Sequence, residues 1–172
     1  MKTLFRAALA ATVATGLFAA PALAAPAATE TFTARAVIVK PVTMANDTDL
    51  DFGTTTMNPS LTSATVTVSD ATGSVAVCSS TQLTCSGGAP AAFTLTGGVA
   101  GQTITVSYDT PPSVLTHTDL VSTVDFSLDA VEDVLLDSSG EGRFNVGGTI
   151  TVVAATVDGA YSAEVDVVAN YL

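Results

Sequence analysis

Three carboxylates at alternate positions are the first candidates for chemistry in this sequence. Asp47, Asp49 and Asp51 fall within residues 46–53, and carboxylate oxygens are the ligands that Ca²⁺ prefers. An EF-hand loop needs glycine directly after its third acid, but Phe52 stands there. Solvated acids at a strand edge explain the same pattern. The run is therefore a weak calcium candidate, and we predict no cofactor and no other metal.

Residue types suited to catalysis are scarce. His117 is the only histidine, and its threonine-rich surroundings predict a surface loop rather than a general base. No serine lies in a G-x-S-x-G elbow, and no phosphate-binding glycine loop follows an expected strand. We therefore predict that the protein is not an enzyme.

The first 24 residues have the pattern of an export signal. Lys2 and Arg6 precede an apolar run over residues 7–20, and Ala24 suits cleavage by a signal peptidase. The apolar run is shorter than the roughly 20 residues that cross a bilayer. We predict a secreted protein at the cell surface or outside the cell, with no transmembrane segment in the mature chain.

Export determines how the two cysteines are interpreted. Cys78 and Cys85 are the only cysteines, and an exported chain meets an oxidising environment in which disulfides form. A metal site would need further ligands near them. We predict a disulfide that closes a small loop and stabilises the protein by about 2–3 kcal/mol. We expect it to pin one loop rather than the whole fold.

The charge balance excludes one class of partner. The sequence has 16 acidic and 5 basic residues, a net charge of -11. Loss of Lys2 and Arg6 with the signal makes the mature chain still more acidic. Such a surface repels phosphate backbones, so we predict no nucleic-acid binding.

Short alternating runs rich in Val, Thr, Ile and Phe dominate the mature chain, separated by Gly, Pro, Asp and Asn. This is an all-β pattern. Many short antiparallel strands must each bury one face, which favours two packed sheets. We predict an antiparallel two-sheet, immunoglobulin-like sandwich with strands at residues 32–40, 50–54, 64–69, 74–78, 92–96, 103–108, 121–128, 142–144, 149–156 and 160–171.

The last expected strand alternates regularly. One face carries Tyr161, Ala163, Val165, Val167, Ala169 and Tyr171. An ordinary half-buried closing strand shows the same alternation.

The first expected strand alternates as well. Phe32, Ala34, Ala36 and Ile38 share one face, and Pro41 then interrupts the ladder because it has no amide donor. Such a strand suits insertion into the sheet of a neighbouring subunit, and it suits equally pairing within its own domain.

The C-terminus resembles that of chaperone-usher pilins. The resemblance rests on the penultimate Tyr171, on Gly159 fourteenth from the end, and on the alternating apolar residues between them. Pilin subunits are incomplete immunoglobulin-like sandwiches, whose groove is filled first by a periplasmic chaperone and then by the next subunit's N-terminal extension. The resemblance implies that Gly159, Tyr161, Val165, Val167 and Tyr171 take the chaperone-recognition positions. It also implies an outer-membrane usher.

The mature chain as a whole resembles a family of secreted β proteins catalogued as domain of unknown function 4402. The resembling pieces are ARAVIVKPVTM, LDFGT, FTLTG, GQTITV, FNVGGTITVVA and GAYSAEVDVVANY. The family's name implies no activity.

These observations predict a structural subunit of an extracellular fibre or pilus that polymerises by donor-strand exchange, with a role in adhesion or biofilm. Its expected parts are a signal peptide (1–24), a tail with the candidate donor strand (25–41) and a β-sandwich domain (42–172). The alternative is a monomeric secreted or surface-attached binding module for a glycan, or one that depends on calcium. The absence of Trp weakens the case for sugar stacking.

Overall fold

The computed structural model describes residues 28–36, 38 and 40–172, so the expected signal peptide lies outside the described residues. The chain divides into two units, Met1–Ala36 and Val37–Leu172. No strand forms over the described part of residues 28–40, and Phe32 and Ile38 are each 91% exposed. The described residues of the strand expected at 32–40 therefore form no strand in the single chain, where they have no hydrogen-bonding partner strand.

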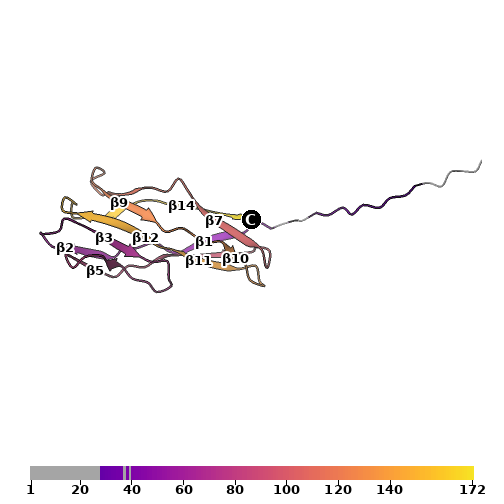
Figure 1. Cartoon of the computed structure of the whole chain (residues 1–172), viewed down its shortest axis with the longest axis horizontal. Coiled ribbons are helices and arrows are strands. Elements are labelled where there is room, and N and C mark those ends of the chain that lie inside the picture. The colour runs from indigo at the N-terminus through magenta and orange to yellow at the C-terminus, as the bar shows by residue number, and fades with distance from the viewer. Residues whose placement is uncertain (1–27, 37, 39) are drawn as a thin grey trace, which may run out of the picture. The chain divides into compact units, whose positions relative to one another are not determined.

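The second unit is built from antiparallel strands, and the prediction of an all-β sandwich is confirmed (Figure 1). Among the described residues there is no helix, and hence none able to cross a membrane. The strands are β1 (Thr43–Thr48), β2 (Thr54–Met57), β3 (Ser63–Val68), β4 (Val77–Cys78), β5 (Leu83–Ser86), β6 (Ala91–Thr96), β7 (Thr103–Asp109), β8 (Val114–His117), β9 (Thr123–Leu128), β10 (Val134–Leu135), β11 (Gly142–Val146), β12 (Gly148–Val153), β13 (Tyr161–Ser162) and β14 (Asp166–Tyr171).

The first layer of the sandwich contains β1, β6 and β11, together with β2 and β5. β1 pairs with β6 and β2 pairs with β5, while an isolated bridge between Asp51 and Ala89 lies between the two pairings. Residues 43–57 therefore run antiparallel to residues 83–96 along most of the layer. The run 43–57 forms its outer edge.

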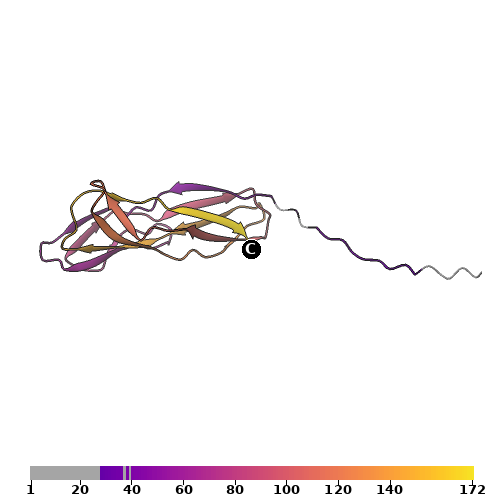
Figure 2. The same ribbon diagram turned by 90° about the horizontal axis from the view of Figure 1, so that it is seen from above.

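The other strands form two hydrogen-bonded sheets, β10-β7-β14 and β13-β8-β9-β12-β3-β4, which we treat together as the second layer. β14 pairs with β7, and β13 pairs with β8, which follows β7 in the chain. β9, β12, β3 and β4 extend the layer away from β8. Residues 161–171 therefore form the outer edge of this layer, and Figure 2 shows β14 as the yellow arrow ending at the C-terminus.

The single strand expected at 160–171 is wrong in one respect. The chain forms β13, leaves the ladder over residues 163–165 and re-enters it as β14. Residue 162 pairs with residue 116, and residue 166 pairs with residue 109. Between these two pairs the edge has three residues, whereas the segment that joins β7 to β8 and the start of β8 contribute six. The two sides therefore cannot stay in one continuous register.

Three clusters of buried side chains form the core. One packs β3 and β12 against Leu61 and Leu83, another packs β6 against β7 and β10, and the third lies beneath β8 and β9. Leu95 and Ile104 have no exposed surface and mark the centre of the second cluster. Members of the first and third clusters also line the site described next.

Candidate functional site

An apolar groove of about 1130 Å³ opens between the two layers. Its walls are the inner faces of β6, β9 and β12, represented by Phe93, Phe126 and Ile150. Phe52 meets Phe126 edge-on, with ring centroids 6.0 Å apart and an interplanar angle of 88°. These aromatic and aliphatic side chains are typical of a sandwich interior, yet they face an unfilled space.

Two strand edges border the groove. Residues 49–53 and 55–57 of the first layer lie along one side, and residues 156–165 with Val167 of the second layer lie along the other. β1, β2, β13 and β14 each have only one neighbouring strand among the described residues. Each edge therefore presents backbone N–H and C=O groups that are free to pair with an additional strand.

Four of the five residues singled out at the C-terminus line this groove. They are Gly159, Tyr161, Val165 and Val167, whereas Tyr171 does not line it. The residues that alternate along the last expected strand therefore lie on an edge that borders the groove. The opposite walls carried no recognisable signal, because Phe93 and Phe126 are ordinary alternating strand residues.

Tyr171 instead closes one end of the sandwich. Its ring packs against the cluster around Leu95, and its hydroxyl donates to the backbone oxygen of Lys40 at 2.8 Å. The same hydroxyl accepts from the backbone N–H of Val99 at 3.0 Å. Tyr171 therefore fixes the residue at which the N-terminal segment joins the sandwich.

Gly159 lies where the groove edge meets His117. Its φ of 147° is unfavourable for other residues, and a Cβ here would collide with the imidazole ring. The expectation of a surface loop for His117 is wrong, because the residue ends β8 and its side chain is only 11% exposed. Its ring also packs on Tyr161, with centroids 4.9 Å apart. His117 therefore supports the rim by packing.

Tyr108 lies on the wall of the groove. Its hydroxyl donates to the backbone oxygen of Asp129 at 2.7 Å. Burial, and then the negative charges of Asp129 and Asp70, raise the pKa of Tyr108 to about 12. Burial and the charge of Asp70 also raise the pKa of the Asp129 carboxyl. Two acids thus approach each other beside the bend between β11 and β12.

We expect Asp129→Asn to raise the melting temperature at pH 7 by a few degrees. Because the pKa of Asp129 is higher in the folded chain than in the unfolded chain, its ionised form destabilises the fold above the folded pKa. Below the unfolded pKa the carboxyl is protonated in both states, so this penalty vanishes. Thermal unfolding of variant and wild type from pH 3 to pH 7 measures the difference, with Asp125→Asn as an exposed control. A difference that is the same at every pH would contradict this assignment.

The candidate calcium ligands are not assembled into one site. Asp47 accepts a hydrogen bond from the Thr94 hydroxyl, and Asp49 accepts one from the Asn46 side chain at 2.6 Å. Asp51 accepts one from the backbone N–H of Gly53 at 2.8 Å. Over the described part of the chain, no three His, Cys, Asp or Glu side chains are grouped to hold a metal ion. Asp49 and Asp51 instead lie on the rim of the groove.

The predicted disulfide between Cys78 and Cys85 is confirmed, with Cα atoms 5.8 Å apart. The structure adds a feature that the spacing of the two cysteines does not indicate. Cys78 is in β4 and pairs toward β3, whereas Cys85 is in β5 and pairs with β2. The bond therefore joins the two layers, although its ring is short in sequence, and both cysteines pack against the cluster around Val66.

We expect the double substitution Cys78→Ser and Cys85→Ser to lower the free energy of unfolding by about 2–3 kcal/mol while the fold persists. The ring is small, and the remaining core does not depend on it. Denaturant unfolding of the variant, and of wild type with and without reductant, provides the comparison. Wild type in reductant should match the variant, and an unchanged unfolding free energy would refute the stabilising role.

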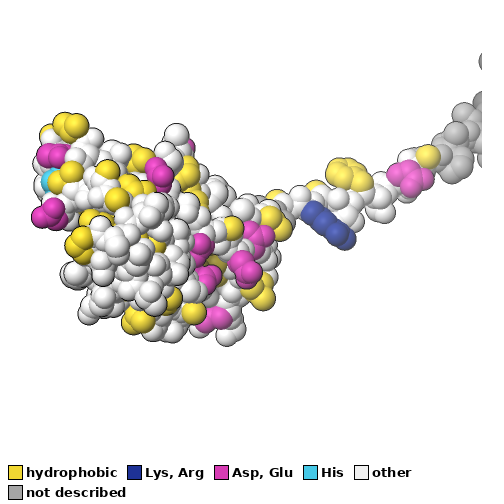
Figure 3. All heavy atoms as spheres, turned by 60° about the vertical axis from the view of Figure 1, so that its left-hand side comes forward, with side chains coloured by type: hydrophobic (Ala, Val, Ile, Leu, Met, Phe, Trp, Pro, Cys, Tyr) yellow, Lys and Arg dark blue, Asp and Glu magenta, His cyan; other side chains and the backbone are white. Residues whose placement is uncertain are grey.

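The surface of the sandwich is strongly acidic. On the face drawn in Figure 3, Asp and Glu side chains recur, and no Lys or Arg is seen on the sandwich in that view. At the groove the exposed acids are Asp49, Asp51, Asp158 and Glu164. The groove is therefore apolar inside and negatively charged at its rim.

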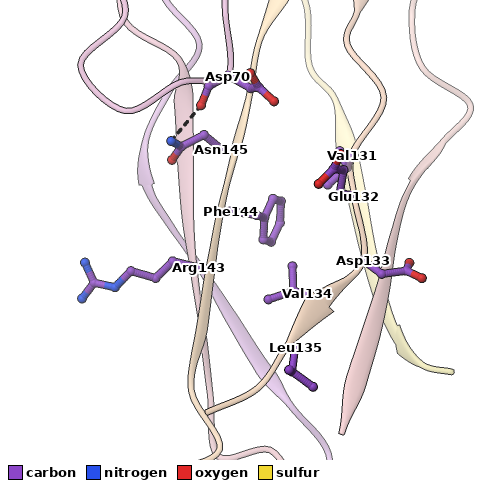
Figure 4. A pocket seen from close by; sticks show the side chains of 9 residues that line it. All are labelled: Asp70, Val131, Glu132, Asp133, Val134, Leu135, Arg143, Phe144 and Asn145. Atoms are coloured by element: carbon purple, nitrogen blue, oxygen red, sulfur yellow. Dashed lines mark hydrogen bonds between the residues drawn. The ribbon is translucent and has the colours of Figure 1, made fainter. Parts of the chain in front are cut away.

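A smaller pocket of about 360 Å³ lies between β11 and residues 131–135 (Figure 4). Phe144 points into it above Val134, while the exposed Arg143 points away. Asn145 closes one end by donating to the backbone oxygen of Asp70 at 2.9 Å. Its charged side chains do not converge on one point, and its volume is about a third of that of the groove.

Fold and site define the class of this protein: an antiparallel β-sandwich with an apolar groove left open between two strand edges. Within that class, the chain belongs to the family described as Domain of unknown function (DUF4402), which matches residues 42–171. The resemblance to this family is thus confirmed. Neither the curated proteins nor the solved structures contain a significant match to the chain.

Proposed function

We propose that the protein is a structural subunit of an extracellular fibre or pilus, in which the N-terminal segment of one copy fills the groove of the next. The role extends to adhesion or biofilm formation. Export through the inner membrane, a periplasmic chaperone and an outer-membrane usher belong to the same proposal.

The observation that carries the proposal is the open groove. Its volume of about 1130 Å³ exceeds the range of about 300–1,000 Å³ that is usual for small-molecule pockets. Phe52, Phe93 and Ile150 are half-buried, so part of their surface stays in contact with water unless an occupant covers it. Phe126 and Val152, deeper in the wall, are already buried. Free edges on both sides favour an occupant that supplies backbone hydrogen bonds, which is an extended polypeptide.

The chain itself contains a segment of matching pattern and length. Phe32, Ala34, Ala36 and Ile38 alternate over seven residues. The groove edge also has seven residues between Tyr161, where β13 begins, and Val167, its last lining residue. At about 3.3 Å per residue, each stretch covers roughly 20 Å. The side chains of Phe32 and Ile38 are almost fully exposed in the single chain, so their burial in a neighbour would be favourable.

The alternative of a monomeric binding module is less well supported. Such a module would complete its sandwich within one chain and present a separate polar site. The unfilled groove and the dispersed acids at residues 47–51 favour the fibre subunit instead.

Electron microscopy of fibres sheared from the producing cells tests the proposal. We expect the fibres to contain this chain by mass spectrometry and to be labelled along their length by an antibody against it. Cells that lack the gene should lose these fibres. A chain recovered only as a soluble monomer, from cells whose fibres are unchanged by the deletion, would refute the proposal.

A further inference from the structure

We propose that an ion pair between Arg35 of the incoming segment and Glu164 on the groove rim sets the register of the inserted strand. The inference rests on the proposed function, because it assumes that the segment occupies the groove. It adds which charged residue is recognised and which acid recognises it.

The first support is the uneven distribution of charge along the chain. Of the 16 acids, only Glu30 precedes residue 42, and of the 5 basic residues, only Arg143 follows it. In the mature chain, Arg35 and Lys40 therefore lie in or beside the candidate donor strand. The groove that would receive them has Asp49, Asp51, Asp158 and Glu164 at its rim. Opposite charges of this kind accelerate encounter and disfavour wrong registers.

The second support is the position of the two charges within their stretches. Arg35 is the central residue of the seven from Phe32 to Ile38. Glu164 is the central residue of the seven from Tyr161, where β13 begins and the preceding lining loop of residues 156–160 ends, to Val167. If the ends of the two stretches are aligned, the central residues face each other whether the strands run parallel or antiparallel. A shift in register would separate them.

The third support is the face on which each charge lies. The apolar donor residues have even numbers, which places Arg35 on the outward face of the inserted strand. All four of Tyr161, Glu164, Val165 and Val167 border the groove, and of these only Glu164 is exposed. Both charged side chains would then lie on the solvent side of the pairing, where opposite charges on neighbouring strands stabilise it.

The backbone around Glu164 is also available. Residues 163–165 lie between β13 and β14 and belong to neither strand. The full chain therefore offers an unpaired stretch at the level where the inference places Arg35.

A binding cycle with synthetic peptides tests the pairing. The acceptor is the full mature chain with Phe32→Gln and Ile38→Gln, so that its own segment does not compete. The probes are a fluorescent peptide of residues 29–40 and the same peptide with Arg35→Glu. Each is titrated by anisotropy against the acceptor and against the acceptor that also carries Glu164→Lys.

We expect Arg35→Glu to weaken binding to the Glu164 acceptor about five- to tenfold, as removal of an opposite-charge pair and creation of a like-charge pair predict. On the Glu164→Lys acceptor, the Arg35→Glu peptide should bind several-fold better than the unchanged peptide. The preference of each acceptor for the oppositely charged peptide should shrink in 0.5 M salt. The Debye length at that concentration is on the order of 4 Å, so an exposed ion pair is screened. An acceptor with Asp125→Lys is the matched control, since Asp125 is exposed on β9 and does not line the groove.

The possible failures are distinguishable. If both peptides bind every acceptor equally well, the segment occupies the groove but the ion pair is refuted. If Asp125→Lys restores the Arg35→Glu peptide as well as Glu164→Lys does, only the overall charge matters and the specific pairing is refuted. If neither peptide binds at any salt concentration, the proposed function fails and this inference fails with it.

Discussion

Replacing Phe32 and Ile38 together by glutamine should abolish fibres while leaving the sandwich folded. Both side chains are 91% exposed in the single chain, so neither contributes to its core. In an apolar groove, each change removes about 1.5–3 kcal/mol of favourable burial free energy from the binding of the segment. It also introduces a side-chain amide that the apolar walls cannot hydrogen-bond. The combined loss corresponds to more than a hundredfold in the affinity between subunits.

The matched control is Thr31→Gln with Thr33→Gln, which adds the same polar groups on the opposite face of the segment. Fibre yield per folded subunit, measured by electron microscopy and by sedimentation, should fall only for the first variant. The melting temperatures of the purified subunits should agree within error. Normal fibres from the Phe32 and Ile38 variant would exclude this segment as the donor.

Many strands of the sandwich can be predicted from the alternation of apolar and polar residues, because a strand with one buried face places apolar side chains at every second position. Residues 64–69, 92–96 and 103–108 were predicted on this basis and correspond to β3, β6 and β7. β1 escaped prediction because five of its six residues are exposed, which leaves no apolar face to recognise. Its position depends on pairing with β6, a long-range contact that the local sequence does not encode.

The candidate site could be predicted only on one side. Tyr161, Val165 and Val167 stand out in the sequence because a strand with one solvent-exposed face has an apolar residue at every second position. The opposite walls come from strands that are distant in sequence, and the groove exists only because residues 49–57 and 156–167 stay apart in the fold. Likewise, the pairing of Cys78 with Cys85 follows from their number, whereas their position across the two layers requires the fold.

A second copy of the segment fused behind the C-terminus should convert the subunit into a stable monomer. The fusion places a flexible linker of about eight Gly and Ser residues after Leu172, followed by residues 29–40. Such a linker spans the roughly 17 Å along β14 from Leu172 back to Val167. Burial of Phe32 and Ile38 of the appended copy contributes about 3–6 kcal/mol. For a chain of this size, that corresponds to a rise in melting temperature of about 10 °C.

The same fusion should no longer polymerise, because its groove is already occupied. Its matched control carries Phe32→Gln and Ile38→Gln in the appended copy alone, which keeps the linker, the length and the native N-terminal segment. The control should melt like the unmodified subunit and assemble normally. Calorimetry and light scattering on the three proteins separate the outcomes: stabilisation with loss of assembly is expected from a groove that accepts this strand. Equal melting temperatures and equal assembly for fusion and control would mean that the groove does not bind the segment, since the linked copy is present at a high effective concentration and would occupy any site that it fits.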